Sequence, residues 1–485
     1  MAENNEPLLL TKEDSGKKKE KYDYYENCPG CQVEKSKAEN TNVPWLQFFF
    51  IWIITLASAL PISFIFPFLY YMVRDFGIAK REEDVSFYAG FEGSAFMVGR
   101  TFTAIIWGMV ADRYGRKPAL ILSTLSVVIF NTMFGLSTTY WMALFSRFCL
   151  GAFCGTLGPM RAYASEVSRR EHQALGLGMM SSARGIGLVI GPALGGYLAQ
   201  PADKIPSVFS QESIFGRFPY FLASMVISIF AFGVFILCFW LPETLHTHEG
   251  DREDVDEEKL VNTEEGTSNS WISLLLNWPL MSTIIVYCVF QLHDMAYVEI
   301  FSLWTVSPRT LGGLGLATDD VGEALVVAGV ALLLFQLLLY PFMERNLGPI
   351  AVSRVSSIVS IAVLASFPFF VNLKGTILSV VVDAASAAKN VLSVAITTGL
   401  YLLQNRAVDQ HQRGAANGLS LCIMSICKAI APALAGALLS WTETRQSATF
   451  LPGPHMIFFL LNAVQFVGFL MTFEPFLAKP AQDFC

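Results

Sequence analysis

Long apolar segments recur along the whole chain of 485 residues, and they constrain its fold more than any other feature. Each has the length of about 20 residues that a helix needs to cross roughly 30 Å of hydrocarbon. Hydrophobic residues make up 53% of the sequence and charged residues only 15%, a balance that a soluble domain does not carry. We therefore expect an all-α, multi-pass membrane protein.

A window of about 20 residues predicts twelve membrane-spanning helices. They cover residues 44–72, 86–111, 118–137, 140–163, 173–199, 218–241, 275–304, 320–343, 350–372, 375–403, 414–440 and 454–477. An even number of spans places both termini on the same side. The lysine-rich tail and the arginines of several loops predict that this side is the cytosol. The polar tail has no apolar core of a signal peptide, so we expect none to be cleaved.

A hydrophilic stretch, Glu243 to Ser270, separates the sixth span from the seventh. It holds ten acidic residues against Arg252 and Lys259, the composition of a solvated linker. This stretch divides the chain into two sets of six spans. We expect five parts: a cytosolic tail at 1–43, a six-helix bundle at 44–242, an acidic cytosolic linker at 243–274, a second six-helix bundle at 275–478 and a short tail at 479–485.

The two sets of six spans look like copies of one another. At a constant offset of 240 residues, Pro192 of the fifth span matches Pro432 of the eleventh, and Gly196 matches Gly436. Two six-helix repeats that rock about a site at the membrane midplane are the arrangement used for alternating access. The repeat therefore favours a transporter.

A short charged turn, GMVADRYGRK at Gly108–Lys117, joins the second and third spans. Together with the twelve spans, this turn resembles the major facilitator superfamily over essentially the whole membrane region. The matching residues are Gly108, Asp112, Arg113, Gly115, Arg116 and Lys117. The resemblance implies that the turn latches the halves in the outward-facing state, with the aspartate near a helix N-terminus and the arginines beside carboxylates. A weaker copy, PFMERNLGP with Glu344 and Arg345, follows the eighth span. Simple positive-inside anchoring explains Arg116 and Lys117 but not the glycines.

The fifth span carries small residues that resemble the pattern of the superfamily's proton-driven exporters. They are Gly191, Pro192, Gly195 and Gly196. Small residues let helices approach closely, and proline permits a bend, so ordinary helix packing is the alternative interpretation. Arg147 in the fourth span resembles the arginine to which these exporters' proton transfer is attributed. The resemblance favours export in exchange for protons.

Four further segments resemble the plant zinc-induced facilitator-like family. They are YENCPGC, WGMVADRYGRKP, PETLHTH and LLQNRAVDQHQRGAANG, and they are spread over the whole chain. Members of that family are implicated in moving metal chelators such as nicotianamine or phytosiderophores, and in zinc, iron and potassium homeostasis. The resemblance implies a vacuolar or plasma membrane protein of a plant cell.

Ionisable side chains near the middle of the spans indicate the substrate. A charge at that depth costs at least about 2.5 kcal/mol and normally faces a cavity or a partner. Arg100, Arg184, Lys389 and Lys428 lie there, with Asp294 as the central acid. A bare divalent metal would need several carboxylate, imidazole or thiolate ligands. We therefore expect a small polycarboxylate to bind, with Asp294 or Glu299 holding an amine of the substrate or the coupling proton. Structural pairing within the protein is the alternative for the arginines.

Proton coupling needs titratable groups inside the spans. The candidates are Arg147, Glu92, His293, Asp294, Glu299 and Asp383. A histidine titrates near neutral pH, and Tyr297 shares a helix face with His293, so a relay is one interpretation and a buried structural histidine the other.

Cysteines and histidines outside the spans suggest a weak cytosolic metal site. Cys28 and Cys31 have the spacing of half a zinc site, and His246 and His248 supply candidate ligands from the linker. A reduced tail without metal is the default interpretation.

Three classes of function remain. The favoured one is a proton-coupled antiporter for a carboxylate-bearing metal chelator. The second is a potassium or zinc cation/proton antiporter, with Asp294, Glu299 and Asp383 as its site, and the third is a transport-inactive metal sensor. No phosphate loop, nucleophile elbow or HExxH helix is present, so we expect no enzyme. We also expect a monomer in the bilayer, with no cofactor and no nucleic acid partner.

Overall fold

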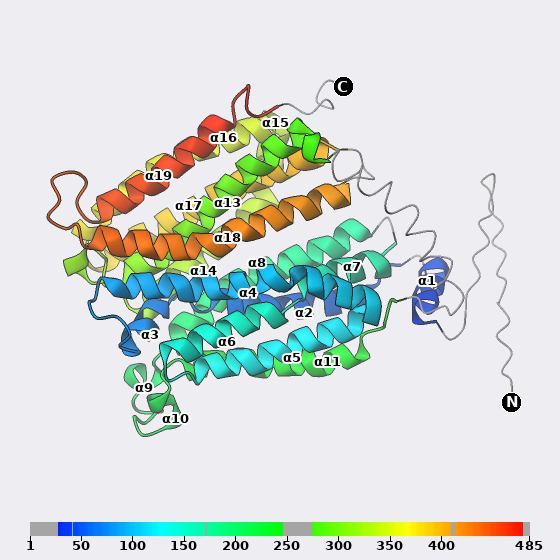
Figure 1. Ribbon diagram of the computed structural model, residues 1–485, viewed down its shortest axis with the longest axis horizontal. Coiled ribbons are helices and arrows are strands. Elements are labelled where there is room, and N and C mark those ends of the chain that lie inside the picture. Colours follow the sequence, from blue (N-terminus) through cyan, green and yellow to red (C-terminus); the bar gives the residue numbers. More distant parts are fainter. Residues whose placement is uncertain (1–27, 41, 170–171, 246–273, 409–412, 479–485) are drawn as a thin grey trace.

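The computed structural model describes residues 28–40, 42–169, 172–245, 274–408 and 413–478, and within these ranges the chain is helical and contains no strand. The helices form two bundles that lie side by side (Figure 1). A small helix, α1 (Pro29–Glu39), lies beyond one end of the first bundle.

The N-terminal half is the first bundle, drawn in blue to green in Figure 1. Its helices are α2 (Trp45–Ser63), α3 (Leu69–Asp75), α4 (Asp84–Tyr114), α5 (Arg116–Gly135), α6 (Tyr140–Phe153), α7 (Leu157–Val167), α8 (Gln173–Leu198), α9 (Pro201–Lys204), α10 (Ile214–Arg217), α11 (Phe221–Leu237) and the 3₁₀ turn Cys238–Trp240. The fourth predicted span is thus broken into α6 and α7.

The C-terminal half is the second bundle, in green to red. Its helices are α13 (Trp278–Val306), the 3₁₀ turn Arg309–Leu311, α14 (Thr318–Leu334), the π-helical turn Phe335–Leu339, α15 (Tyr340–Leu347), α16 (Pro349–Ser366), the 3₁₀ turn Phe367–Asn372, α17 (Gly375–Arg406), α18 (Arg413–Glu443) and α19 (Pro454–Met471).

Helices occupy all twelve predicted ranges, but fewer satisfy a strict test for a membrane span. Among the described residues, nine helical segments are long and apolar enough to cross a bilayer, and up to ten if α4, bent by 49° between Ala104 and Ile106, counts as one span. The π-helical turn limits α14 to 17 residues. The chain is a multi-pass membrane protein, and the count of twelve stays a prediction.

The two halves are packed together at one end of the molecule. We call the end that carries the charged turn Gly108–Lys117 the turn end, and the opposite end the far end. One hydrophobic cluster at the far end joins aromatic residues of both halves, among them Phe64, Phe134, Trp304 and Phe458. Nearer the turn end the clusters are separate, one around Met160 within the N-terminal half and others within the C-terminal half.

Polar contacts also join the halves at the far end. Tyr71 donates to the backbone oxygen of Leu316 at 2.7 Å, and the backbone N–H of Ala433 donates to Ser94 at 2.8 Å. Lys204 forms an ion pair with Asp319 at 3.6 Å. Together with the shared hydrophobic cluster, these contacts close the far end.

Two glycine crossings bring helices of opposite halves into backbone contact. A Cβ atom built at Gly196 of α8 would lie 2.9 Å from the Cα atom of Gly322 in α14. A Cβ atom at Gly436 of α18 would lie 2.8 Å from the Cα atom of Gly90 in α4. Because Gly196 and Gly436 are the residues matched by the internal repeat, each half contributes the same kind of crossing.

Gly195 packs α8 inside its own half and provides a stability test. A Cβ atom there would lie 1.8 Å from the backbone oxygen of Phe64, so Gly195→Ala should lower the unfolding free energy by about 1–3 kcal/mol. Gly178, in the same helix, has nothing within 4 Å of a built Cβ atom. Gly178→Ala should be neutral or slightly stabilising because alanine favours helix. Thermal unfolding in detergent measures both, and equal midpoints would contradict this packing.

Candidate functional site

Four basic side chains from both halves lie together, and we call them the basic cluster. They are Arg100 of α4, Arg161 of α7, Arg184 of α8 and Lys428 of α18. Arg100 is close enough to Arg184 and Arg161 for their charges to interact. Lys428, from the C-terminal half, interacts in the same way with Arg184 and Arg100. The basic cluster therefore lies between the halves.

The side chains of the basic cluster are accessible from outside the protein. Arg161 and Arg184 are exposed, and Arg100 and Lys428 are partly exposed. Arg100 and Arg184 also line a pocket of about 50 Å³ within the N-terminal half. A charge that remains accessible at this depth indicates a hydrated site rather than a buried structural pair.

Polar groups of the C-terminal half face the basic cluster. The charge of Arg161 interacts with Tyr401 and Tyr287, and Tyr287 also lies in range of Arg184. Asp294 of α13 lies in charge range of Lys428. Four cations against one carboxylate leave a net positive field, which attracts anions.

Lys389 does not join the basic cluster. Its side chain is completely buried, and its Nζ atom lies 4.7 Å from the ring centre of Tyr297. The Nζ atom donates to Ser393 at 3.3 Å, and Ser393 in turn donates to Asp294. Lys389 thus lies behind Asp294, seen from the basic cluster, and Arg161 completes the set of four cations instead.

His293 is buried in the same region of the C-terminal half. It is 1% exposed, and its charge interacts with that of Lys389. Its Nε2 atom has no hydrogen-bond partner among the described residues. A buried histidine and a buried lysine therefore lie beside Asp294, and the proton relay stays a prediction.

Two carboxyl groups meet at the interface between the halves. Glu92 of α4 and Glu299 of α13 are 1% and 0% exposed, and no described residue forms a hydrogen bond with their four oxygens. A Cβ atom at Gly93 would lie 2.7 Å from Oε2 of Glu299, so this carboxyl group lies directly against α4. We call Glu92 and Glu299 the carboxyl pair.

Arg147 of α6 is the cation that faces the carboxyl pair. It is 2% exposed, and its charge interacts with both Glu92 and Glu299. Its Nη1 atom donates to the backbone oxygen of Pro61 at 2.6 Å, and its guanidinium group lies 5.3 Å from the ring centre of Phe96. Arg147, which these contacts hold in place, therefore faces both carboxyl groups.

Asp383 lies apart from the other acids predicted to couple protons. Its charge interacts with Glu323 and Asp320 of α14. The three acids considered for a cation site, Asp294, Glu299 and Asp383, therefore have different neighbours. Among the described ranges, no group of three His, Cys, Asp or Glu side chains is close enough to hold a metal ion.

The charged turn is held by carboxylates of its own half. Arg116 forms ion pairs with Asp112 at 2.6 Å and with Glu166 of α7 at 2.9 Å. Gly115 adopts a φ of +105°, a conformation that favours glycine. Arg113 is exposed, and Lys117 donates to the backbone oxygen of Phe239 at 2.7 Å. Arg116 therefore lies between two carboxylates, and these contacts tie the turn within its own half, so the predicted latch between the halves stays a prediction.

Glu243 caps this turn although it begins the predicted linker. Its carboxylate accepts hydrogen bonds from the backbone N–H groups of Arg116 and Lys117 at 2.9 and 3.0 Å. It also accepts from those of Thr244 and Leu245 at 2.8 and 3.1 Å. The carboxylate therefore joins the start of α5 to the chain that follows the sixth predicted span.

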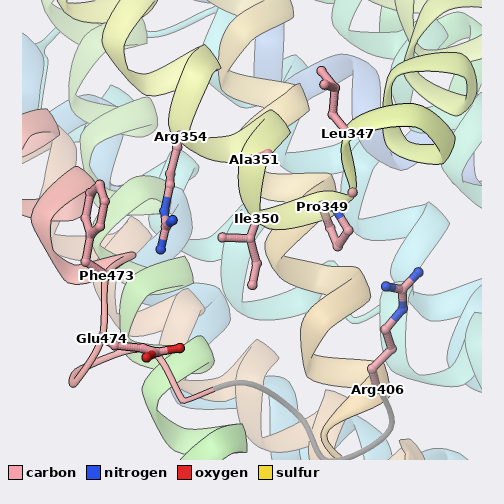
Figure 2. Close-up of a pocket in the computed structure, with 9 residues that line it drawn as sticks. Leu347, Pro349, Ile350, Ala351, Arg354, Arg406, Phe473 and Glu474 are labelled. Carbon is pink, nitrogen blue, oxygen red and sulfur yellow. The ribbon is translucent and has the colours of Figure 1, made fainter. Parts of the chain in front are cut away.

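The C-terminal half has a matching turn at the same end of the molecule. Gly348 precedes α16 with a φ of +75°, and Glu344 forms an ion pair with Arg406 at 2.9 Å, while Arg345 is exposed. A pocket of about 670 Å³ opens beside this turn, with Arg354 next to Phe473 (Figure 2). All its lining residues belong to the C-terminal half, so it is separate from the basic cluster.

The cysteine segment reaches the end of the sixth predicted span. The backbone N–H of Gly30 donates to the backbone oxygen of Leu245 at 3.2 Å, and Cys28 and Cys31 are 1% and 4% exposed. His246 and His248, the other predicted ligands, lie outside the described residues. The metal site with Cys28, Cys31, His246 and His248 stays a prediction, although the two segments do meet.

Glu243 should control how firmly α1 is held. Glu243→Gln removes the charge from four hydrogen bonds, each of which contributes about 1.5–3 kcal/mol when charged. We expect faster hydrogen exchange of the amides in α1 and at the start of α5, measured by mass spectrometry. Glu212→Gln, at an exposed position near the far end, serves as the control. Unchanged exchange in α1 would contradict the link through Leu245.

Arg161 is the site residue that the sequence interpretation missed. It lies near the end of the predicted span 140–163, away from the midplane positions that were considered. The signal for its position is the break between α6 and α7, where Cys154, Gly155 and Thr156 interrupt the helix just before this segment. A second helix that starts inside a span can direct its charges toward the interior.

Comparisons with known proteins agree with this architecture. Residues 51–432 match the family model described as Major Facilitator Superfamily. The Arabidopsis thaliana protein Zinc Induced Facilitator-Like 1 is 55% identical over 95% of this chain and 97% of its own. Zinc Induced Facilitator 1, from the same plant, is 52% identical over 94% of this chain and 97% of its own.

Solved structures share the fold at low sequence identity. The crystal structure of a D-xylose-proton symporter superposes with a TM-score of 0.68 at 14% identity, over 90% of this chain and 98% of that chain. That of the human organic anion transporter MFSD10 superposes with a TM-score of 0.58 at 15% identity, over 89% and 100%. With a family match across most of the chain and two relatives above 50% identity, this chain belongs to the major facilitator superfamily and, within it, to the zinc-induced facilitator-like family.

Proposed function

We propose that this protein is a proton-coupled antiporter that moves a small, carboxylate-bearing metal chelator out of the cytosol, across the vacuolar or plasma membrane of a plant cell. Nicotianamine and the phytosiderophores are the chelators with the right chemistry. One observation carries this proposal: basic side chains of both halves converge on a solvent-accessible site.

The basic cluster suits a solute with several carboxylates. A guanidinium group binds a carboxylate through two parallel hydrogen bonds, and three guanidinium groups are present. Lys428 adds a cation from the opposite half, and Asp294 beside it can accept an amine of the solute. A chelator that carries both carboxylates and amines would therefore contact both halves. Contact with both halves is what allows a solute to influence their relative movement.

The far end of the molecule is closed in this structure, which supports entry of the solute from the turn end. The far end is closed by the shared hydrophobic cluster and by the glycine crossings. Positive charges near the turn end predict that it faces the cytosol. The state described here is then the inward-facing one, in which a cytosolic solute reaches the basic cluster.

The carboxyl pair is the proposed coupling site. Two buried carboxyl groups share one guanidinium, and burying a second, uncompensated negative charge would be costly. One carboxyl group therefore binds a proton as the far end closes. Opening the far end would separate α13 from α4 and hydrate the pair, so this proton comes from the far-side solution. For antiport, the proton would then leave to the cytosol through the open turn end when a chelator binds the basic cluster, and the chelator would leave in the opposite direction when the far end reopens.

A cation antiporter is the second candidate, and the geometry favours it less. Its site would need Asp294, Glu299 and Asp383 together, whereas Asp294 faces lysines, Glu299 faces Arg147 and Asp383 faces acids of α14. The third candidate, a metal sensor, rests on the meeting of the cysteine segment with Leu245. Zinc binding in the absence of any solute flux would favour it.

A counterflow panel in proteoliposomes tests the proposal. Vesicles loaded with unlabelled nicotianamine should take up labelled nicotianamine, and a pH gradient alone should drive its accumulation. Labelled potassium or zinc without chelator should not enter faster than in protein-free vesicles. Zinc or potassium flux that needs no chelator and is lost in Asp294→Asn would instead establish the cation antiporter.

A further inference from the structure

Glu443 is a buried carboxyl group at the far end that the proposed transport cycle does not use. It is the last residue of α18 and is 3% exposed. Ser86, at the start of α4, donates to its Oε2 atom at 3.2 Å, and Ser307, at the end of α13, donates to its Oε1 atom at 2.6 Å. Glu443 therefore joins the C-terminal half to the N-terminal half where the far end closes.

The groups around Glu443 are neutral or negative. From α3, Tyr70 is in range, and from the segment before α4, so are Glu82 and Glu83. Arg81, the nearby cation in that segment, pairs with Glu83 and Asp84 instead.

The segment that follows α18 offers no cation either. Arg445 is turned toward the ring of Trp441, 4.7 Å away, and toward the backbone oxygen of Phe450 at 3.3 Å. Gln446 donates to the backbone oxygen of Glu443 rather than to its carboxyl group. Within the described ranges, no lysine or arginine forms an ion pair with Glu443.

We propose that Glu443 is a proton-binding latch of the far end, protonated when the two halves are closed there and ionised when they are open. An ionised carboxylate shut in with two hydroxyl groups and nearby acids would lose its hydration without gaining a cation. A protonated carboxyl group keeps both contacts, because a serine hydroxyl can accept a hydrogen bond as well as donate one. Opening exposes the group to water, where the proton leaves.

The latch differs from the carboxyl pair in the side of the membrane to which its proton is released. Glu443 lies at the far end, so it takes its proton from the far-side solution and returns it to the same solution. It moves no net charge across the membrane. A low pH on the far side instead protonates Glu443 and favours closure of the far end. The carrier thereby returns to the state in which the turn end is accessible. The carrier would then return faster when the far compartment is acidic.

The latch can be tested without any solute. Spin labels at Val208 of the N-terminal half and Phe450 of the C-terminal half, both exposed at 70% and 66%, report the separation of the halves at the far end. Exposed Cys422, partly exposed Cys427 and Cys485, which lies outside the described residues, are replaced by serine to keep the labels specific. Electron spin resonance distances are then recorded from acidic to alkaline pH. In the parent protein we expect the open-to-closed ratio to rise with pH, and Glu443 to contribute up to about tenfold per pH unit, the limit for one proton.

Three variants separate the latch from its alternatives. In Glu443→Gln the ratio should stay low and lose the part of its pH dependence that Glu443 contributes, because the closed contacts persist and no proton binds at this position. In Ser86→Ala, which removes the contact of Glu443 with α4, the ratio should rise at every pH but keep its slope. Glu212→Gln, at an exposed site, should behave like the parent.

Two outcomes would overturn the proposal. One is a pH-independent ratio in the parent protein, and the other is an unchanged slope in Glu443→Gln. Neither depends on chelator transport, so the latch and the proposed function fail separately. If both hold, Glu443→Gln should leave the number of protons exchanged per chelator unchanged, as judged from flux ratios.

Discussion

Replacing Arg184 by alanine is expected to lower the transport of nicotianamine by at least about 30-fold. Arg184 is an exposed member of the basic cluster, and its charge interacts with Arg161 of its own half and with Lys428 of the other. Loss of one partner from a charge pair that becomes desolvated costs about 2–5 kcal/mol, and each 1.4 kcal/mol is a factor of ten. The measurement is kcat/KM for counterflow in proteoliposomes.

Two further variants make this test specific. Arg184→Lys keeps the charge but not the paired hydrogen bonds of a guanidinium group, so its kcat/KM should lie between parent and alanine variant. Arg217→Ala removes an exposed arginine from α10 at the far end, remote from the basic cluster, and should leave transport unchanged. Equal loss in Arg184→Ala and Arg217→Ala, or full transport in Arg184→Ala, would refute a substrate site in the basic cluster.

Replacing Glu299 by glutamine is expected to uncouple the carrier from protons. The glutamine side chain mimics a permanently protonated carboxyl group within the buried carboxyl pair, so the state closed at the far end stays available. Counterflow, which needs no net proton movement, should continue. Accumulation driven by a pH gradient should fall to the level of equilibration, because one titrating group has been removed from the cycle.

The matching variants define the coupling pair. Glu92→Gln should give the same separation of counterflow from driven uptake, since both carboxyl groups face Arg147. Glu323→Gln, an acid on α14 near Asp383, should retain driven uptake. If Glu299→Gln still accumulates chelator against a gradient, the carboxyl pair does not couple protons. If it also loses counterflow, its role is structural.

The sequence predicts the helical fold and the positions of charged residues along the spans, but not which way each side chain faces. Counting residues along a span locates Arg100, Arg184, Lys389 and Lys428 near the midplane, because a helix rises by about 1.5 Å per residue. The direction of a side chain around its helix depends on how the neighbouring helices pack. Lys389 therefore proved to lie behind Asp294, although its depth matches that of Lys428.

Two further residues show why the sequence around a residue is not sufficient to predict its contacts. Arg161 lies in the basic cluster because the fourth predicted span is broken, and a uniform apolar window does not reveal the break between α6 and α7. Glu243 belongs by composition to an acidic linker, yet its carboxylate caps the turn before α5, 127 residues earlier in the chain. Contacts over such separations follow from the tertiary fold and from nothing near the residue itself.

The duplicated glycine crossings have a mechanical consequence for how the carrier moves. Since Gly196 and Gly436 are matched by the internal repeat, the two crossings at the closed far end, Gly196 against Gly322 and Gly436 against Gly90, are alike in build. A bulky residue at one crossing would push apart the two helices of that crossing only, so the bundles would tilt unevenly. Comparing a bulky substitution at one crossing with the same substitution at the other would show whether both bundles rotate equally or whether one stays still while the other rotates.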